Sequence, residues 1–109
     1  MEFDEYQEKA GTTAMYPDVG NNFIYPTLGL AGETGEIVEK VKKLIRDKNS
    51  KPDGQFKEEI KRELGDLLWY MARVSSEFGI SLSDVAATNI NKLESRKSRD
   101  KIHGEGDSR

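Results

Sequence analysis

Four acidic side chains stand in two pairs of identical spacing, and this repeat is where the sequence could carry out chemistry. Glu33 and Glu36 form the first pair, and Glu63 and Asp66 form the second. Residues three apart lie on adjoining turns of a helix, so each pair presents two carboxylates on one side. Mg²⁺ prefers oxygen ligands, chiefly carboxylates together with water and substrate phosphate. If the two helices pack against each other, the four carboxylates converge on a site for a hard cation.

A single acidic pair could equally be the solvated face of an amphipathic helix, because 34% of the residues are charged. The repeat argues for a site, since both pairs take the same position beside the apolar stripe of their helix. Glycines strengthen that argument. Gly29, Gly32 and Gly35 lie inside the helical pattern that also contains the first acidic pair. Each glycine costs a helix roughly 0.8 to 1 kcal/mol relative to alanine. We therefore expect a neighbouring backbone or a ligand to approach this flank closely.

The elements that must position these acids are helices, and no strand pattern is present, so the predicted class is all-α. Apolar residues recur at intervals of three and four residues, as on one face of a helix, over residues 3–14, 26–46 and 56–78. Gly79 is placed to end the third helix in a left-handed cap. Ser81 to Asp84 has the form of a capping box and opens a fourth helix that continues to about residue 96.

The composition describes one domain over residues 1–109, in which the tail from about residue 100 has the character of a flexible terminus. A net charge of -3 argues against a general nucleic-acid binder, and the lack of cysteine excludes a zinc-thiolate site. No signal peptide or membrane-length apolar run is present, so we expect a cytoplasmic protein without a membrane partner. Since only 35% of the residues are hydrophobic and four helices need covering, we predict a homo-oligomer.

Polar and basic residues on the fourth helix are the candidates for binding an anionic substrate. Asn89 falls on the apolar side of that helix, with Lys92 and Arg96 close beside it. One interpretation is a buried asparagine that bonds a neighbouring helix backbone. The other is a stripe that receives phosphate oxygens, for which lysine and arginine are suited. Tyr25, which precedes the glycine flank, is a candidate for stacking on a nucleotide base, although it could equally cover the core.

Two segments resemble a known family. GLAGETGEIVEKVKK, followed by KRELGDLLWYMARVSSEFGISL, is similar to the MazG-like nucleotide pyrophosphohydrolases of the all-α NTP pyrophosphatase superfamily. The resemblance extends over nearly the whole chain. It implies a four-helix bundle-like MazG fold, assembled as a homodimer or homotetramer. The implied activity is Mg²⁺-dependent hydrolysis of (deoxy)nucleoside triphosphates between the α and β phosphates, with Mn²⁺ as a substitute metal, in nucleotide-pool control or house-cleaning.

By position, the resemblance makes metal ligands of the four acids, Glu33, Glu36, Glu63 and Asp66. It also matches Asn89, Lys92 and Arg96 to the family's phosphate-binding residues. A carboxylate that the metal does not fully use can orient the attacking water, so Glu33 and Glu36 are both candidates for the general base. Two alternatives remain open. One is phosphoribosyl-ATP pyrophosphatase, and the other is a non-catalytic helical module for dimerisation or partner binding.

Overall fold

The computed structural model describes residues 1–109 and is entirely helical. Its elements are α1 (Phe3–Thr12), α2 (Ile24–Lys48), α3 (Gly54–Glu77) and α4 (Leu82–Ser98). The predicted all-α class is confirmed, and the predicted bounds differ from the observed ones by no more than about two residues, as expected where helix ends fray. None of these helices combines the length and the apolar character that crossing a membrane requires.

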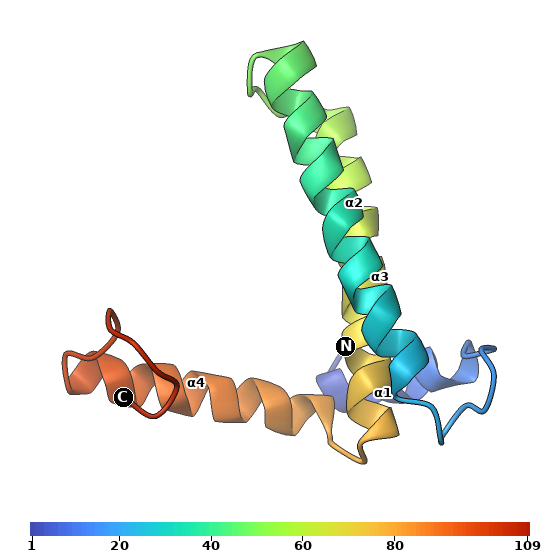
Figure 1. Ribbon diagram of the computed structural model, residues 1–109, viewed down its shortest axis with the longest axis vertical. Coiled ribbons are helices and arrows are strands. Elements are labelled where there is room, and N and C mark those ends of the chain that lie inside the picture. Colours follow the sequence, from blue (N-terminus) through green and yellow to red (C-terminus); the bar gives the residue numbers. More distant parts are fainter.

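Helices α2 and α3 lie side by side in opposite directions and form the long hairpin of Figure 1. Both are amphipathic, and their apolar stripes supply the seam between them: Leu44 is buried, and Ile37 and Leu67 are half-buried. Asp53 caps the start of α3, because its carboxylate accepts a hydrogen bond from the backbone N–H of Phe56 at 2.8 Å. This hairpin is the scaffold that carries both acidic pairs.

The turn between α3 and α4 is fixed by local hydrogen bonds. Gly79 adopts a φ of +69°, which residues with a Cβ rarely adopt, as the sequence predicted. The N–H of Ile80 bonds the carbonyl of Ser75 at 2.8 Å, and that of Gly79 bonds Ser76 at 3.0 Å, which is a Schellman motif. The Ser81 hydroxyl then accepts from the N–H of Asp84 and opens α4. The chain therefore leaves α3 in a defined direction.

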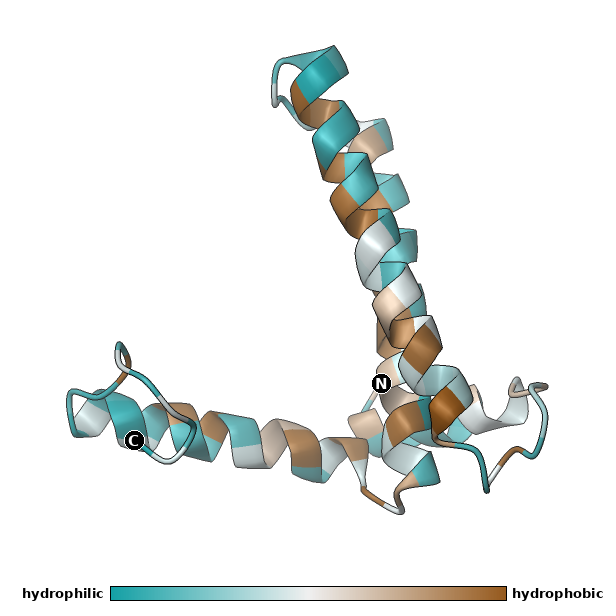
Figure 2. Ribbon diagram, viewed as in Figure 1, coloured by the Kyte–Doolittle hydropathy of each residue, from teal (hydrophilic) through white to brown (hydrophobic).

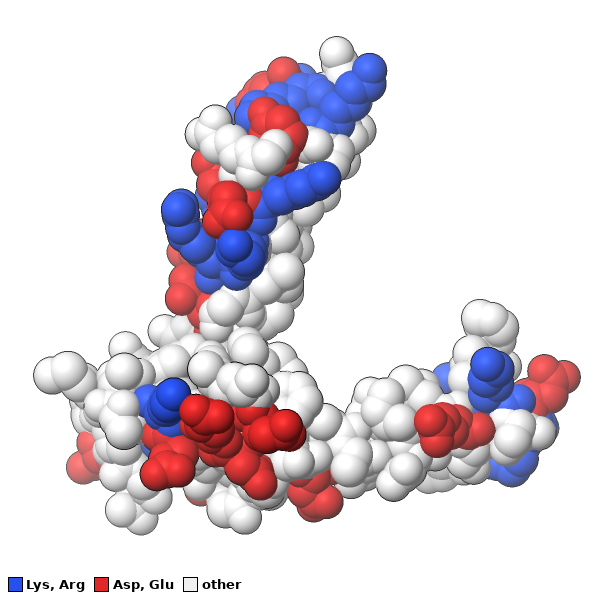
Figure 3. Space-filling model, turned by 180° about the vertical axis from the view of Figure 1, so that it is seen from behind, with Lys and Arg blue, Asp and Glu red and all other residues white.

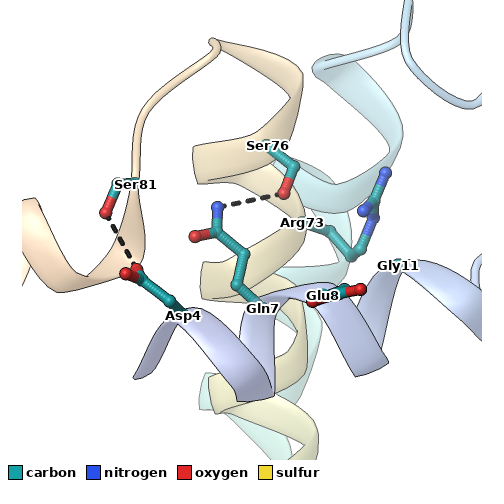
Figure 4. Close-up of a pocket in the computed structure, with 7 residues that line it drawn as sticks. All are labelled: Asp4, Gln7, Glu8, Gly11, Arg73, Ser76 and Ser81. Carbon is teal, nitrogen blue, oxygen red and sulfur yellow. Dashed lines mark hydrogen bonds between the residues drawn. The ribbon is translucent and has the colours of Figure 1, made fainter. Parts of the chain in front are cut away.

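Helix α1 crosses the base of the hairpin and joins it to α4. Ala10, Ala72 and Leu82 form a small buried core there, with Leu68 and Trp69 packed against it. The side chain of Gln7 links three segments: its amide donates to the Ser76 hydroxyl and the Ile80 carbonyl, and its oxygen accepts from the Leu82 N–H. Figure 4 shows the hollow of about 530 Å³ beside this junction, which is lined entirely by polar residues and glycine and does not include the acidic pairs.

The four helices do not close into a compact bundle within one chain. Helix α4 contacts α1 and α3 but not α2, and it runs away from the hairpin so that the molecule has the shape of an L (Figure 1). The radius of gyration is 16.8 Å, whereas about 13 Å is expected for a compact chain of this length. The long arms cannot bury their apolar sides against each other in this arrangement.

Much apolar surface is consequently exposed, and Figure 2 shows hydrophobic positions along the open length of α2 and α4. The exposed large apolar residues on the three longer helices include Leu28, Val38, Val41, Ile45, Leu64, Met71, Ile90 and Leu93. Contiguous exposed apolar surface of this kind usually marks an interaction site. The homo-oligomer stays a prediction, and this surface is where a second copy would bind.

Candidate metal and phosphate site

Helices α2 and α3 bring three of the four predicted acids together. Carboxylate oxygens of Glu33, Glu36 and Glu63 lie within 4.8 Å of one another at one edge of the hairpin seam. Asp66 lies one turn beyond Glu63 and is exposed. It does not belong to this close group, although its charge still acts on Glu33. The structure therefore places the acids as a cluster of three with a neighbouring fourth, and their role as metal ligands stays a prediction.

The electrostatics of the cluster are unfavourable without a cation. The pKa of Glu33 is raised from its ordinary value to about 7, first by burial, then by contact with the Glu63 carboxyl and by the charges of Glu36 and Asp66. One oxygen of Glu33 and one of Glu63 are shielded from solvent and have no hydrogen-bond partner. Buried acceptors are almost always satisfied in proteins. A divalent cation with oxygen ligands would satisfy both atoms and relieve the repulsion, so the donor set fits Mg²⁺.

Lys40 is the cation closest to these acids, and the sequence interpretation missed it. Its Nζ lies 4.0 Å from Glu63 Oε1 and 3.8 Å from Glu59 Oε2. A signal for it exists, because Lys40 follows Glu33 by seven residues and Glu36 by four, and these spacings share one face of a helix. Every phosphate-binding cation predicted from the sequence lies on the last helix, so Lys40 was not among them.

An aromatic side chain explains one of the helical glycines. A Cβ placed on Gly29 would lie 2.1 Å from Cε1 of Tyr70, so this ring rests directly on the glycine. The pKa of Tyr70 is raised by burial and then by its neighbours Tyr25 and Glu33, which places the ring beside the acids. The prediction that a backbone or ligand approaches this flank is therefore wrong at Gly29 as to the neighbour, because the ring of a tyrosine side chain makes the close approach. Gly32 and Gly35 face open space.

Tyr25 lies at the same end of the hairpin. Its ring stacks on the ring of Tyr16 at a centroid distance of 4.9 Å, and 45% of the surface of Tyr25 is exposed. Tyr16 is held in turn by Arg73, whose Nε and Nη2 donate to the phenol oxygen at 3.1 and 3.0 Å. Tyr25 thus covers Tyr16 while part of its own surface stays exposed. Its contact with a nucleotide base stays a prediction.

The predicted phosphate-binding residues of α4 are not brought to the acids within one chain, because α4 makes no contact with α2. Asn89 is exposed at the rim of an apolar groove, so within one chain it is not buried against a neighbouring helix backbone. Lys92 and Arg96 both bind the carboxylate of Asp107, at 2.7 and 3.0 Å.

The tail from residue 100 folds back along α4. It covers Arg96, which is the least exposed basic residue of that helix. The side chain of Arg96 is only 6% exposed, and its guanidinium also bonds the backbone carbonyl of Asp107. Arg109 closes the tail by donating to the carbonyls of Lys101, Ile102 and Gly106. In this conformation a carboxylate lies where a phosphate group was predicted to bind.

The fold is all-α, with a cluster of carboxylates on a hairpin of two long helices, and the comparisons with known proteins identify a family with which this chain agrees in sequence. The chain belongs to the family described as the MazG nucleotide pyrophosphohydrolase domain, whose sequence pattern matches residues 26–99. These residues include the acidic cluster and the predicted phosphate-binding part of α4. The expected family membership is confirmed.

A phage protein is similar to this chain over its whole length. The Gene 37 protein of Mycobacterium phage L5 is 43% identical over 114 residues, and the alignment covers 100% of both chains. No solved structure matches the chain.

Proposed function

We propose that the protein hydrolyses nucleoside or deoxynucleoside triphosphates between the α and β phosphates, releasing a monophosphate and pyrophosphate. One observation carries this proposal: two shielded carboxylate oxygens, on Glu33 and Glu63, lack any partner in a cluster of three glutamates on the family's hairpin. Glu33, Glu36, Glu63 and Asp66 would hold Mg²⁺, with Mn²⁺ as a substitute. When bound, the metal would neutralise phosphate charge and polarise the phosphoryl group.

The two candidates for the general base differ in their surroundings. Glu33 is half-buried, and its shielded oxygen faces the other acids rather than water. Glu36 is exposed, so its carboxylate can contact a water molecule and accept its proton. This difference favours Glu36 as the residue that orients the nucleophile and Glu33 as a ligand.

A second copy of the chain would complete the site. Asn89, Lys92 and Arg96 lie on a helix that extends away from its own acids, and α2, α3 and α4 each keep large apolar side chains exposed outside the hairpin seam. A homodimer or homotetramer that buried these surfaces could place α4 of one copy beside the acids of another. Asp107 would then have to release Lys92 and Arg96 before a phosphate group could bind them.

Product identification tests the activity. Purified protein is incubated with Mg²⁺ and a panel of canonical and modified (deoxy)nucleoside triphosphates, with phosphoribosyl-ATP included. We expect a monophosphate and pyrophosphate from at least one triphosphate, and no product from Glu63→Gln. Turnover of phosphoribosyl-ATP alone would identify the alternative enzyme. Release of a nucleoside diphosphate and orthophosphate would contradict the proposal.

The non-catalytic alternative is tested by stability. Binding of a cation to the folded state alone raises the melting temperature, and the rise grows with the logarithm of the cation concentration once that concentration exceeds Kd. We expect millimolar Mg²⁺ or Mn²⁺ to raise it for the native chain and to leave Glu63→Gln almost unchanged. A native melting temperature that ignores both metals would favour a helical module whose acids are merely solvated.

A further inference from the structure

A small surface pocket adjoins the acidic cluster on the hairpin. It has a volume of about 180 Å³ and is lined by Glu36, Glu39, Lys40, Lys43 and Glu63. Glu36 and Glu63 therefore belong to the acidic cluster and also line the pocket. Two lysine side chains line the remaining surface. On the side of the molecule shown in Figure 3, basic side chains of the hairpin lie directly beside acidic ones.

Lys40 is held loosely by its acidic neighbours. Its distances of 3.8 Å to Glu59 and 4.0 Å to Glu63 are too long for a hydrogen bond, and its side chain is only 31% exposed. The stem is thus packed on the hairpin while the ammonium group has no close partner. Lys42 differs, because it forms a 2.9 Å ion pair with Glu39 and is 61% exposed. The ammonium group of Lys40 can therefore bind a new anion without breaking a short bond.

We propose that Lys40, assisted by Lys43, binds the β and γ phosphates of the substrate and stabilises the leaving pyrophosphate. This inference rests on the proposed function. In that reaction a water oxygen bonds to the α-phosphorus and the water gives up a proton to a carboxylate of the site. The bond from the α-phosphorus to the bridging oxygen breaks, and its electron pair stays on the oxygen of the departing diphosphate. A fixed ammonium group stabilises the charge that develops there.

The position of the pocket supports this assignment. Glu36 and Glu63 are common to the cluster and the pocket, so a phosphate chain that contacts the cation site continues directly toward Lys40. Lys43 lines the same pocket and has only a 4.0 Å contact with Glu39. Both lysines belong to the chain that provides the acids. They would therefore act on the leaving group whether or not α4 of another copy supplies the remaining phosphate contacts.

The competing explanation is that Lys40 only balances the charge of the acids. Calorimetric binding of inorganic pyrophosphate in the presence of Mg²⁺ separates the two. We compare the native chain with Lys40→Met, which keeps the stem and removes the charge, and with Lys42→Met as the matched control. Because a charge-assisted hydrogen bond to phosphate is lost, we expect Lys40→Met to weaken pyrophosphate binding by about tenfold or more. Lys42→Met should bind as the native chain does.

Binding of Mg²⁺ alone, measured on the same proteins, completes the design. Tighter Mg²⁺ binding by Lys40→Met with unchanged pyrophosphate affinity would overturn the proposal and leave Lys40 as a counter-ion. Should Lys40→Met fail to fold, the exposed Lys43→Met provides the second variant, and an unchanged pyrophosphate affinity there would overturn the proposal equally. Failure of the proposed function looks different, because the native chain would then neither bind pyrophosphate nor hydrolyse any triphosphate.

Discussion

Glu33 connects the stability of this protein to its chemistry. Its carboxyl lies against that of Glu63, one of its oxygens is shielded from water, and its pKa is raised to about 7. Carboxylates held this close repel one another when no cation lies between them, and the raised pKa expresses that repulsion together with burial. The same repulsion makes the free energy of unfolding fall as the pH rises, which a surface glutamate with an ordinary pKa would not cause.

The pH dependence of the metal-free protein follows from this pKa. Below about pH 4.5 the Glu33 carboxyl is protonated in both the folded and the unfolded chain. Between pH 4.5 and about 7 only the unfolded chain releases the proton, so the contribution of Glu33 to the free energy of unfolding falls as the pH rises. Above pH 7 the loss is complete. Denaturation in EDTA should show this fall in the native chain and a weaker one in Glu33→Gln.

Added Mg²⁺ provides the control for that experiment. Since the cation requires the deprotonated carboxylate, it should stabilise the protein more at pH 8 than at pH 5. Equal stabilisation at both values would place the cation away from Glu33.

Asp66 and Arg96 have opposite roles in the proposed site, and paired variants separate them. Asp66 is exposed, so Asp66→Asn should leave the helices intact while abolishing turnover and the stabilisation by Mg²⁺. Arg96→Ala should retain that stabilisation and raise KM, lower kcat, or both if its contact strengthens in the transition state. Steady-state kinetics and melting curves with and without Mg²⁺ measure both variants. An active Asp66→Asn together with an unfolded Arg96→Ala would place the site elsewhere.

At the scale of elements, patterns among residues close in the sequence predicted the helices and turns, whereas most contacts between distant segments were not predicted. Helix bounds followed from apolar periodicity, and Gly79 and Ser81 fixed the turn before α4 through bonds to residues close in sequence. The local bonds of the turn set the direction in which the chain leaves α3, whereas the packing of α4 against α1 joins residues far apart in the sequence and was not visible there. For the same reason the pairing of Asp107 with Arg96 and the contact of Tyr70 with Gly29 were not foreseen.

The glycines of α2 provide a matched pair of variants on one helix. Gly29→Ala would force Tyr70 to move, because the added Cβ lies 2.1 Å from its ring. We expect it to destabilise the protein by about 1–3 kcal/mol, less the helical gain. Gly32→Ala meets open space and should stabilise the chain by up to about 1 kcal/mol. Urea denaturation measures both, and equal effects would contradict the role assigned to Gly29.

At the scale of the whole molecule, one chain does not bring its proposed phosphate-binding helix to its acidic cluster. Only nine of 109 residues are buried, and the two arms of the L share a small core where they meet. An isologous dimer would cover the same apolar surface on both copies and could exchange their α4 helices across the axis. The acids of each site would then come from one copy and its α4 cations from the other.

Complementation between two impaired variants tests this shared site, with the activity of the mixture measured above what each variant retains alone. Glu63→Gln lacks an acid and Arg96→Ala lacks a cation, so each homodimer has two defective sites. If sites are shared, a mixed dimer has one site with both defects and one with neither. Random re-association of equal amounts makes half of the dimers mixed, which should restore about a quarter of the native activity. Sites built within one chain would regain nothing on mixing, because every site would keep the defect of its own chain.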